Sequence, residues 1–308
     1  MTSGIQPVPR LIVEVRGGRA ANTKTVIPPG QTRTFGRTEL SDVPIPHDET
    51  LGSVHFDLTW DGATCRLRDR KSLTGTELDG ARVLTARVPH GGWIRAGKTD
   101  FVVLEEGHSQ RSFLVEGADA DEEDARNENE SPTPAESTLR ALAELRALAA
   151  REPLYALLDA ARDERILPLL RESVEPHRSL YEGVDGDALE DVAPYLAGPM
   201  QADSMLLDSL VTLGWGKRWG VYVTSPASMK ALRRHFRRFL MVEVAETGEK
   251  LYFRFYDPGA LREVVPGFAP RHVNDLLEET TGFYHEDEAG NVAVLRRIEA
   301  VRREEQQP

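Results

Sequence analysis

The sequence predicts two domains, an all-β sandwich followed by an α+β domain. The chain has 308 residues, of which 40% are hydrophobic, and a chain of this length holds about two ordinary cores. Up to about residue 116 the apolar residues form short runs between turn residues, and from about residue 139 they recur at helical spacing. An acidic stretch separates the two patterns, so we expect domains at residues 1–116 and 139–308.

Strand signals fill the first region. Leu11–Val15 is an apolar run followed closely by glycine, and residues 55–60 precede the turn pair Asp61 and Gly62. Residues 101–104 form another short apolar run. Strands at short, regular spacing with glycine punctuation are typical of a β-sandwich.

Residues 117–138 hold a large share of the negative charge. The chain has a formal net charge of -12, and this segment contributes eight acids against one base, Arg126. It contains two prolines and has no apolar periodicity. A segment of this kind cannot bury enough surface to offset the entropy lost on ordering. We therefore expect a disordered acidic linker here.

The composition also limits the compartment and the ligands. Cys65 is the only cysteine, so an intramolecular disulfide or a cysteine-based zinc cluster cannot form. No apolar run approaches the roughly 18 residues that cross a membrane, and the N-terminus lacks a signal-peptide pattern. Nucleic-acid binding needs a basic surface, whereas this chain is acidic. We expect a cytoplasmic protein that takes no cofactor, metal or nucleic acid and does not insert into a membrane.

Helical periodicity begins in the second region. Leucines recur at three-residue steps in residues 139–148, and a second apolar stripe follows Pro153 at residues 154–161. A third amphipathic run, residues 206–213, ends at Gly214. Glycine after the last apolar position is a usual helix stop. These runs predict helices in the first half of the second domain.

Strand and helix signals alternate further along. A strand-like run at residues 220–223 is followed by Ser225 and Pro226, which suit the N-cap and first turn of a helix. Residues 241–244 and 251–256 then have the composition of two strands joined by a turn. Strand, helix and paired strands in this order indicate an α+β domain.

Three short motifs occur in order in the first region. Arg37 ends a Phe-Gly-Arg motif, Ser53 and His55 share a second, and Thr74 opens a Thr-Gly-Thr motif. Together they are similar to the forkhead-associated (FHA) domain, whose corresponding loops bind phosphothreonine through an arginine and short polar side chains. The resemblance implies that Arg37, Ser53 and Thr74 are candidates for phosphopeptide binding. It gives His55 a structural role.

Several positions depart from the FHA pattern. Gly52 stands where the family has a phosphate-contacting serine, and Ser53 comes one place later. Thr74 stands where the family has asparagine, and Leu73 precedes it where a polar residue is common. Phosphate recognition needs several converging donors, so we expect weak phosphopeptide binding. A sandwich kept for docking or rigidity and a phosphothreonine-binding module both remain open.

Four blocks of the second region carry another resemblance. They lie at residues 180–183, 193–196, 214–216 and 253–258. In this order they resemble the effector chaperone or adaptor family of bacterial type VI secretion. The resemblance implies a non-enzymatic protein that binds a cognate secreted effector, keeps it soluble and helps to load it onto the secreted spike protein.

The last of these blocks predicts the end of a strand. Phenylalanines alternate with Arg254 and Tyr256, so a strand here has an apolar face and an Arg-Tyr face. Asp257 and Pro258 suit a turn, and we interpret both as structural. The resemblance makes Arg254 and Tyr256 candidates for a partner-binding surface.

The most uneven charge lies between Ser209 and Val242, where seven cations occur without an acid. Most fall on the helix expected after Ser225, away from its apolar residues. A solvated face explains any single one of them. As a set they indicate a docking surface for an acidic partner, or for the acidic linker of this chain. The candidate partner-binding cations are Lys230, Arg233, Arg234, Arg237 and Arg238.

The sequence contains no catalytic pattern. His285 lies among carboxylates, but no second histidine stands at metal-ligand spacing. A nucleophile elbow, a phosphate-binding loop with lysine and a His-Glu-x-x-His segment are absent. We therefore expect no enzyme and no catalytic residue. The alternative to an effector adaptor is a phosphothreonine-dependent signalling or docking module that acts on a phosphoprotein through the FHA-like domain.

Overall fold

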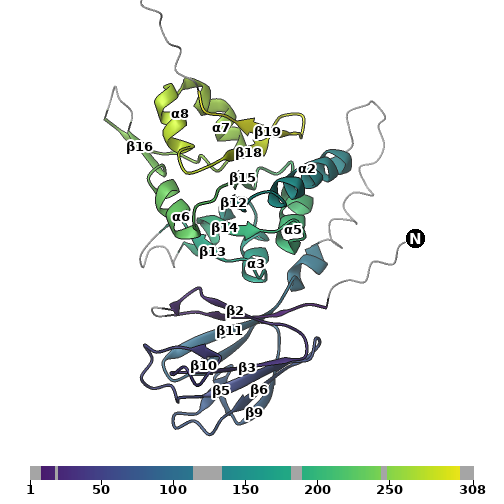
Figure 1. Ribbon diagram of the computed structural model, residues 1–308, viewed down its shortest axis with the longest axis vertical. Coiled ribbons are helices and arrows are strands. Elements are labelled where there is room, and N and C mark those ends of the chain that lie inside the picture. The colour runs from purple at the N-terminus through teal and green to yellow at the C-terminus, as the bar shows by residue number, and fades with distance from the viewer. Residues whose placement is uncertain (1–7, 18–19, 114–133, 182–188, 244–247, 299–308) are drawn as a thin grey trace, which may run out of the picture. The chain divides into compact units, whose positions relative to one another are not determined.

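The computed structural model describes residues 8–17, 20–113, 134–181, 189–243 and 248–298 (Figure 1). The chain folds into two compact units. The N-terminal unit comprises residues 1–112 and 171–176, and the C-terminal unit comprises residues 113–170 and 177–308.

Two β-sheets form the N-terminal unit. One sheet has the strand order β2-β1-β11-β10-β7-β8 and the other β4-β3-β5-β6-β9, and only the β3–β4 pair among the described strands is parallel. The strands of the first sheet are β1 (Leu11–Val15), β2 (Lys24–Ile27), β7 (Thr76–Leu78), β8 (Ala81–Val83), β10 (Gly92–Ala96) and β11 (Thr99–Glu105). Those of the second are β3 (Gln31–Gly36), β4 (Val43–Pro44), β5 (Phe56–Trp60), β6 (Cys65–Asp69) and β9 (Thr85–Val88).

Aromatic rings fill the core of this sandwich. Phe35 and Phe56 stack with ring centroids 4.8 Å apart, and Phe101 meets both edge-on. In β6 and β10, buried and exposed residues alternate, which places one side of each strand in the core. The prediction of an N-terminal all-β sandwich is confirmed.

The C-terminal unit is built on a six-stranded antiparallel sheet with the order β13-β14-β12-β15-β18-β19. Its strands are β12 (Leu154–Asp159), β13 (His177–Ser179), β14 (Pro194–Met200), β15 (Gly220–Thr224), β18 (Gly282–Glu286) and β19 (Val292–Leu295). The α-helices are α2 (Pro134–Ala149), α3 (Ile166–Arg171), α5 (Met205–Gly214), α6 (Met229–Arg237), α7 (Pro258–Val264) and α8 (Pro270–Leu276). A separate hairpin joins β16 (Met241–Glu243) to β17 (Lys250–Tyr252), and short 3-10 turns are η2 (Ala160–Arg162), η3 (Glu190–Val192) and η4 (Val265–Gly267).

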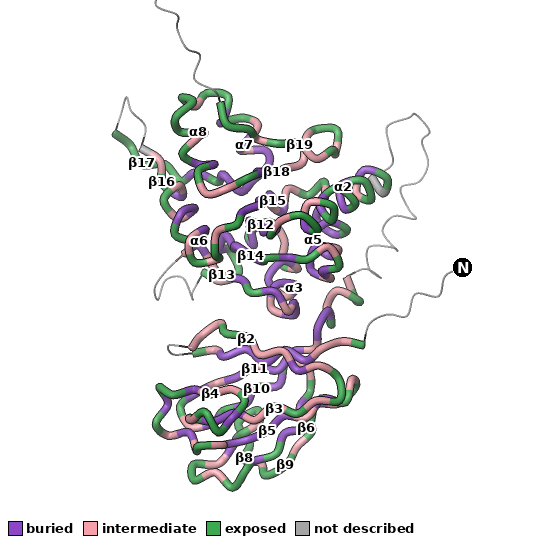
Figure 2. The backbone as a smooth tube through the Cα atoms, viewed as in Figure 1, coloured by how far each residue is buried: buried purple, intermediate pink, exposed green. Residues whose placement is uncertain are grey.

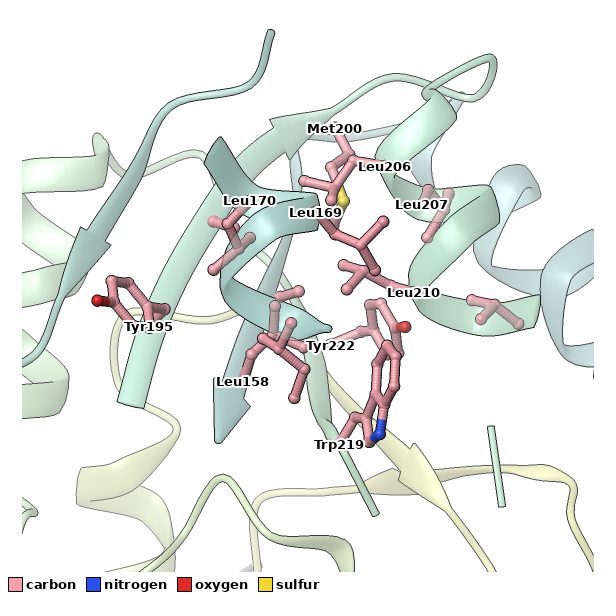
Figure 3. Packing of buried hydrophobic residues seen from close by; sticks show 14 of the residues in the cluster. Leu158, Leu169, Leu170, Tyr195, Met200, Leu206, Leu207, Leu210, Trp219 and Tyr222 are labelled. Carbon is pink, nitrogen blue, oxygen red and sulfur yellow. The ribbon is translucent and has the colours of Figure 1, made fainter. Parts of the chain in front are cut away.

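Helices cover both faces of this sheet (Figures 1 and 2). Alternate side chains of β12 point to different clusters: Leu158 packs with helices α2, α3 and α5, whereas Leu157 packs with α6, α7 and α8. Figure 3 shows the first cluster, in which leucines of α3 and α5 approach Leu158, Trp219 and Tyr222. The prediction of a C-terminal α+β domain is confirmed.

The structure corrects two sequence predictions in the first half of this unit. Residues 154–159 form the strand β12, not a helix; every residue of the strand is buried, so the apolar run lacks the alternation that marks a half-exposed strand. Helix α2 begins at Pro134, so residues 134–138 are helical and do not belong to a linker. Proline at the first helical position and Glu136 in the first turn favour this start. The rest of the expected linker, residues 117–133, lies outside the described residues.

Two further corrections concern the second half. Helix α6 is capped by Ser228, whose side chain accepts a hydrogen bond from the Ala231 amide, and does not begin at Ser225. Ser225 is buried and its hydroxyl donates to the Glu279 carbonyl. Strand β17 ends at Tyr252, so the expected Arg-Tyr face does not form.

Candidate functional sites

Backbone hydrogen bonds hold the Arg37 loop against the loop that precedes β5. The Arg37 amide donates to the Gly52 carbonyl at 2.8 Å, and the Thr38 hydroxyl donates to the Ser53 carbonyl at 3.2 Å. Glycine is required at position 36, because a Cβ there would lie 2.4 Å from the Ser53 carbonyl oxygen. These contacts place the exposed side chains of Arg37 and Ser53 on adjoining loops.

His55 braces two of these loops from inside. Its ring is fully buried, Nδ1 accepts from the Gly52 amide at 3.0 Å, and Nε2 lies 3.0 Å from the Gly75 carbonyl oxygen. Because Nδ1 accepts, Nε2 carries the proton that is donated to Gly75. The geometry of His55 is therefore that of a bracing residue.

In the third loop, between β6 and β7, polar side chains form hydrogen bonds with one another. The Asp69 carboxylate accepts from the hydroxyls of Ser72 and Thr76, at 2.6 and 2.7 Å. Burial raises the pKa of Asp69, but hydrogen bonds from Ser72 and Thr76 outweigh it and hold the pKa below its usual value. Thr74 is exposed with a long 3.4 Å bond to the Thr50 carbonyl, and Leu73 is 95% exposed.

The structure thus gathers the phosphopeptide candidates Arg37, Ser53 and Thr74 at loops that contact one another, with one guanidinium among them. It also adds Arg82, which the sequence analysis missed. Arg82 donates to the Thr74 carbonyl at 3.1 Å and packs where a Cβ of Gly75 would lie. A single arginine within the short strand β8 gives no sequence signal of this contact, because such residues are usually solvated.

Two buried carboxylates anchor a charged cluster in the C-terminal unit. Asp159 ends β12 and caps η2, and Asp257 caps α7 by accepting from the Gly259 amide at 2.8 Å. Arg162 pairs with Asp257, and Arg254 contacts Asp159 at 3.3 Å. Segments that are 95 residues apart in sequence therefore meet in this cluster.

Arg218 completes the cluster. Its Nε and Nη2 atoms donate to the two oxygens of Asp257 at 2.8 and 2.9 Å, the bidentate geometry that makes arginine pairs strong. A Cβ at Gly259 would lie 1.9 Å from Arg218 Nη2, so the glycine makes room for this guanidinium. Asp257 and Pro258 are buried and lie at the start of α7, whereas the expected strand already ends at Tyr252.

The two carboxyl groups differ in proton affinity. Burial raises the pKa of Asp159, and the more distant guanidiniums of Arg254 and Arg162 offset this only in part. Burial also acts to raise the pKa of Asp257, but the hydrogen bonds from Arg218, Gly259 and Arg162 outweigh it and lower the pKa.

Tyr256 is buried and is not a surface residue. The chain turns after β17, so Tyr256 enters the core while Arg254 stays exposed. Its hydroxyl lies 3.1 Å from the Tyr252 hydroxyl, which lies 2.8 Å from that of Tyr181. Burial raises the pKa of Tyr256. Tyr252, not Tyr256, presents its ring to solvent.

The cations on and next to helix α6 differ in the contacts that they make within the chain. Arg233 donates to the Ser179 and Tyr181 carbonyls at 2.6 and 2.8 Å, and Arg238 contacts His235 and Glu278. Lys230 and Arg234 are exposed. Along this helix runs an open groove of about 450 Å³, and no acid is among the described residues that line it. Its lining residues are Ser228, Lys230, Ala231, Arg233, Arg234 and Arg237.

Comparison with known proteins finds matches to two separate parts of the chain. Residues 33–97 match the FHA domain, and residues 154–275 match a domain of unknown function (DUF4123). The chain therefore combines an FHA domain, a phosphopeptide-binding fold, with a DUF4123 domain. No curated protein matches the chain.

Solved FHA domains are similar to about a third of the chain. The FHA domain of the CT664 protein from Chlamydia trachomatis is 15% identical, covering 31% of this chain and 96% of that chain with a TM-score of 0.30. FHA-1 of Rv1747 from Mycobacterium tuberculosis is 24% identical, covering 32% and 99% with a TM-score of 0.27. An FHA domain from Arabidopsis thaliana is 22% identical, covering 34% and 94% with a TM-score of 0.31.

The described residues contain no group of three or more histidine, cysteine, aspartate or glutamate side chains placed to hold a metal ion. In the same part of the chain, no helix is both long and apolar enough to span a bilayer.

Proposed function

We propose that the chain is a non-enzymatic adaptor whose C-terminal unit binds a cognate type VI secretion effector and helps to load it onto the spike protein. The groove on α6 is the observation that carries this proposal. It offers Lys230 and Arg234 to solvent and is lined by no acid among the described residues. The four sequence blocks that resemble the effector chaperone family lie in the same unit.

The groove suits an acidic segment of a partner protein. An exposed ion pair contributes about 0 to 1 kcal/mol, so one substitution has little effect and a set has a clear one. Complementary charge also speeds association, which makes the interaction sensitive to salt. Arg233 fixes the loop at Tyr181 and is therefore unsuited to a test of docking.

The test is co-expression of the full chain with the effector encoded beside it. We expect the effector to stay soluble and to co-purify with the chain. Changing Lys230, Arg234 and Arg237 together to glutamate should weaken this association at least about tenfold, or about 1.4 kcal/mol. The matched control reverses Arg66, Arg87 and Lys98 in the N-terminal unit and should leave it intact. An effector retained equally by both triple variants would refute the role of the groove.

A second function is favoured by the N-terminal loops. The meeting of Arg37, Ser53 and Thr74 supports phosphothreonine-dependent docking on a phosphoprotein. Because Gly52, Leu73 and Thr74 stand where the FHA pattern has polar contacts, we expect phosphothreonine peptides to bind no tighter than about 100 μM. Titration of a peptide library, with Arg37→Ala and unphosphorylated peptides as controls, measures this. A selective low-micromolar ligand that Arg37→Ala abolishes would move the specificity to the FHA domain.

A further inference from the structure

Two guanidiniums of the C-terminal unit share a single carboxylate oxygen. Asp159 Oδ2 lies 3.3 Å from Arg254 Nη1 and 3.8 Å from Arg162 Nε. Both arginines therefore contact the same oxygen of a buried aspartate. The two segments that carry them are the turn η2 and the loop after β17, and hydrogen bonds to the buried carboxylates hold both in place.

These guanidiniums keep donors for an external group. The Arg254 side chain is 47% exposed and makes one hydrogen bond, to Asp159, within the described chain. The Arg162 side chain is 31% exposed, and its hydrogen bond goes to Asp257. Arg218 differs, because its Nε and Nη2 donors are already occupied by the bidentate pair with Asp257. Three arginines face two aspartates, which leaves one positive charge uncompensated within the cluster.

An apolar patch adjoins this charge. Met241 and Tyr252 are cross-strand partners in the β16–β17 hairpin and are 50% and 40% exposed. Tyr252 precedes Arg254 by two residues, which keeps their Cα atoms within about 7 Å of each other. A ligand that places a carboxylate on the arginines can therefore cover apolar surface beside it.

We propose that Arg162 and Arg254 form a clamp for a carboxylate of a partner protein, with an apolar residue of the partner packing against Met241 and Tyr252. The planar forks of two arginines match the two oxygens of a carboxylate. The inference rests on the proposed function insofar as the partner is the effector. Its test needs no effector.

The probe is the blocked dipeptide acetyl-Glu-Leu-amide, added at millimolar concentration to the full chain at low salt. We expect saturable shifts of the Arg162 and Arg254 Nε–Hε signals in ¹⁵N NMR spectra, and none from the matched acetyl-Gln-Leu-amide. The Arg218 signal should stay unchanged. Shifts with inorganic phosphate but not with the glutamate dipeptide would overturn the carboxylate assignment, as would the absence of any shift.

Variants separate the clamp from general charge. Arg254→Lys keeps the charge but loses the planar guanidinium, so it should weaken binding of the glutamate dipeptide at least about tenfold. Joint Arg66→Gln and Arg87→Gln in the N-terminal unit removes two exposed charges and should leave the affinity unchanged. Preserved signal dispersion shows that each variant is folded. Unchanged affinity in Arg254→Lys, or loss of affinity in the Arg66 and Arg87 variant, would refute the clamp. Effector binding that fails while the dipeptide still binds would refute the proposed function alone.

Discussion

Arg37 in the N-terminal unit and Arg254 in the C-terminal unit are both exposed arginines on loops, but their surroundings differ. Around Arg37 the loops are held by neutral donors: His55 bridges the Gly52 amide and the Gly75 carbonyl, and the hydroxyls of Ser72 and Thr76 donate to the Asp69 carboxylate. Around Arg254 the fold depends on the buried charges of Asp159 and Asp257. The first region fixes the shape of the backbone, whereas the second concentrates charge.

The difference shows what each region can tolerate. Neutral bonds can hold loops in place after the groups that contact a ligand have changed, as Gly52 and Thr74 have relative to the FHA pattern. A buried carboxylate is costly without its cations, so Asp257 and its arginine partners depend on one another. Substitutions in the C-terminal cluster should therefore affect stability first, and those in the N-terminal loops should affect binding first.

The largest effect is expected from Asp257→Asn. It keeps an N-cap side chain but removes the charge between Arg162 and Arg218, at a cost of about 2 to 4 kcal/mol. Urea unfolding of the full chain, with hydrogen exchange of β12 to identify the C-terminal unit, measures this. The matched control is Asp208→Asn, which removes an exposed pair with Arg146 and should cost about 1 kcal/mol or less. Equal losses in the two variants would contradict the special weight of the buried cluster.

His55→Ala should have the next largest effect. It leaves the Gly52 amide and the Gly75 carbonyl without their partner in a buried site, which costs about 2 to 3 kcal/mol. Ser53→Ala is the control, because that side chain is exposed, and should change stability by about 0.5 kcal/mol or less. Thermal unfolding with exchange protection of β5 reports on both. A tolerated His55→Ala would mean that the loops are held by their backbone bonds alone.

Binding is the quantity expected to respond at the N-terminal loops. Gly52→Ser with Thr74→Asn restores the FHA residues, and the serine fits because a Cβ at Gly52 meets its nearest atom at 3.5 Å. We expect phosphothreonine peptides to bind about tenfold more tightly, or about 1.4 kcal/mol. Adding Arg37→Ala should cancel the gain. If the double variant gains nothing, the weak binding has a cause other than these two positions.

The sequence predicts most of what depends on local pattern. Turn residues and alternation predict the sandwich, and helical spacing before Gly214 predicts α5. The motif spacing also selects Arg37, Ser53 and Thr74, which the fold then places on contacting loops. These signals are local because each is read within one strand, helix or turn.

Features that depend on contacts between distant segments cannot be predicted from local sequence patterns. Asp257 suggests a turn, but its partners Arg162 and Arg218 come from other segments of the chain. The burial of Tyr256 depends on a chain reversal after β17 that a strand-like composition hides. The helical prediction for β12 is wrong because the two faces of this strand are covered by different helix layers. Each of these three features is determined by tertiary packing, which local composition does not predict.

The smallest stability change is expected from Asp159→Asn. The stability contributed by Asp159 should also depend on pH with the opposite sign to that contributed by Asp257. Burial raises the pKa of Asp159 above its ordinary 3.8, so the folded state favours the protonated form. The free energy of unfolding therefore decreases as the pH rises from the pKa of Asp159 in the unfolded state through its pKa in the folded state. For Asp257, whose pKa is lowered by Arg218 and its other partners against the effect of burial, stability is instead lost as the pH falls through the folded pKa. At neutral pH Asp159→Asn should lie within about 1 kcal/mol of the wild type. Its stability relative to the wild type should fall as the pH drops from the raised folded pKa toward the ordinary value of 3.8, and should stay constant below it. Urea unfolding at several pH values compares the two variants, and parallel pH profiles would show that the two carboxyl groups are equivalent, against the geometry of the cluster.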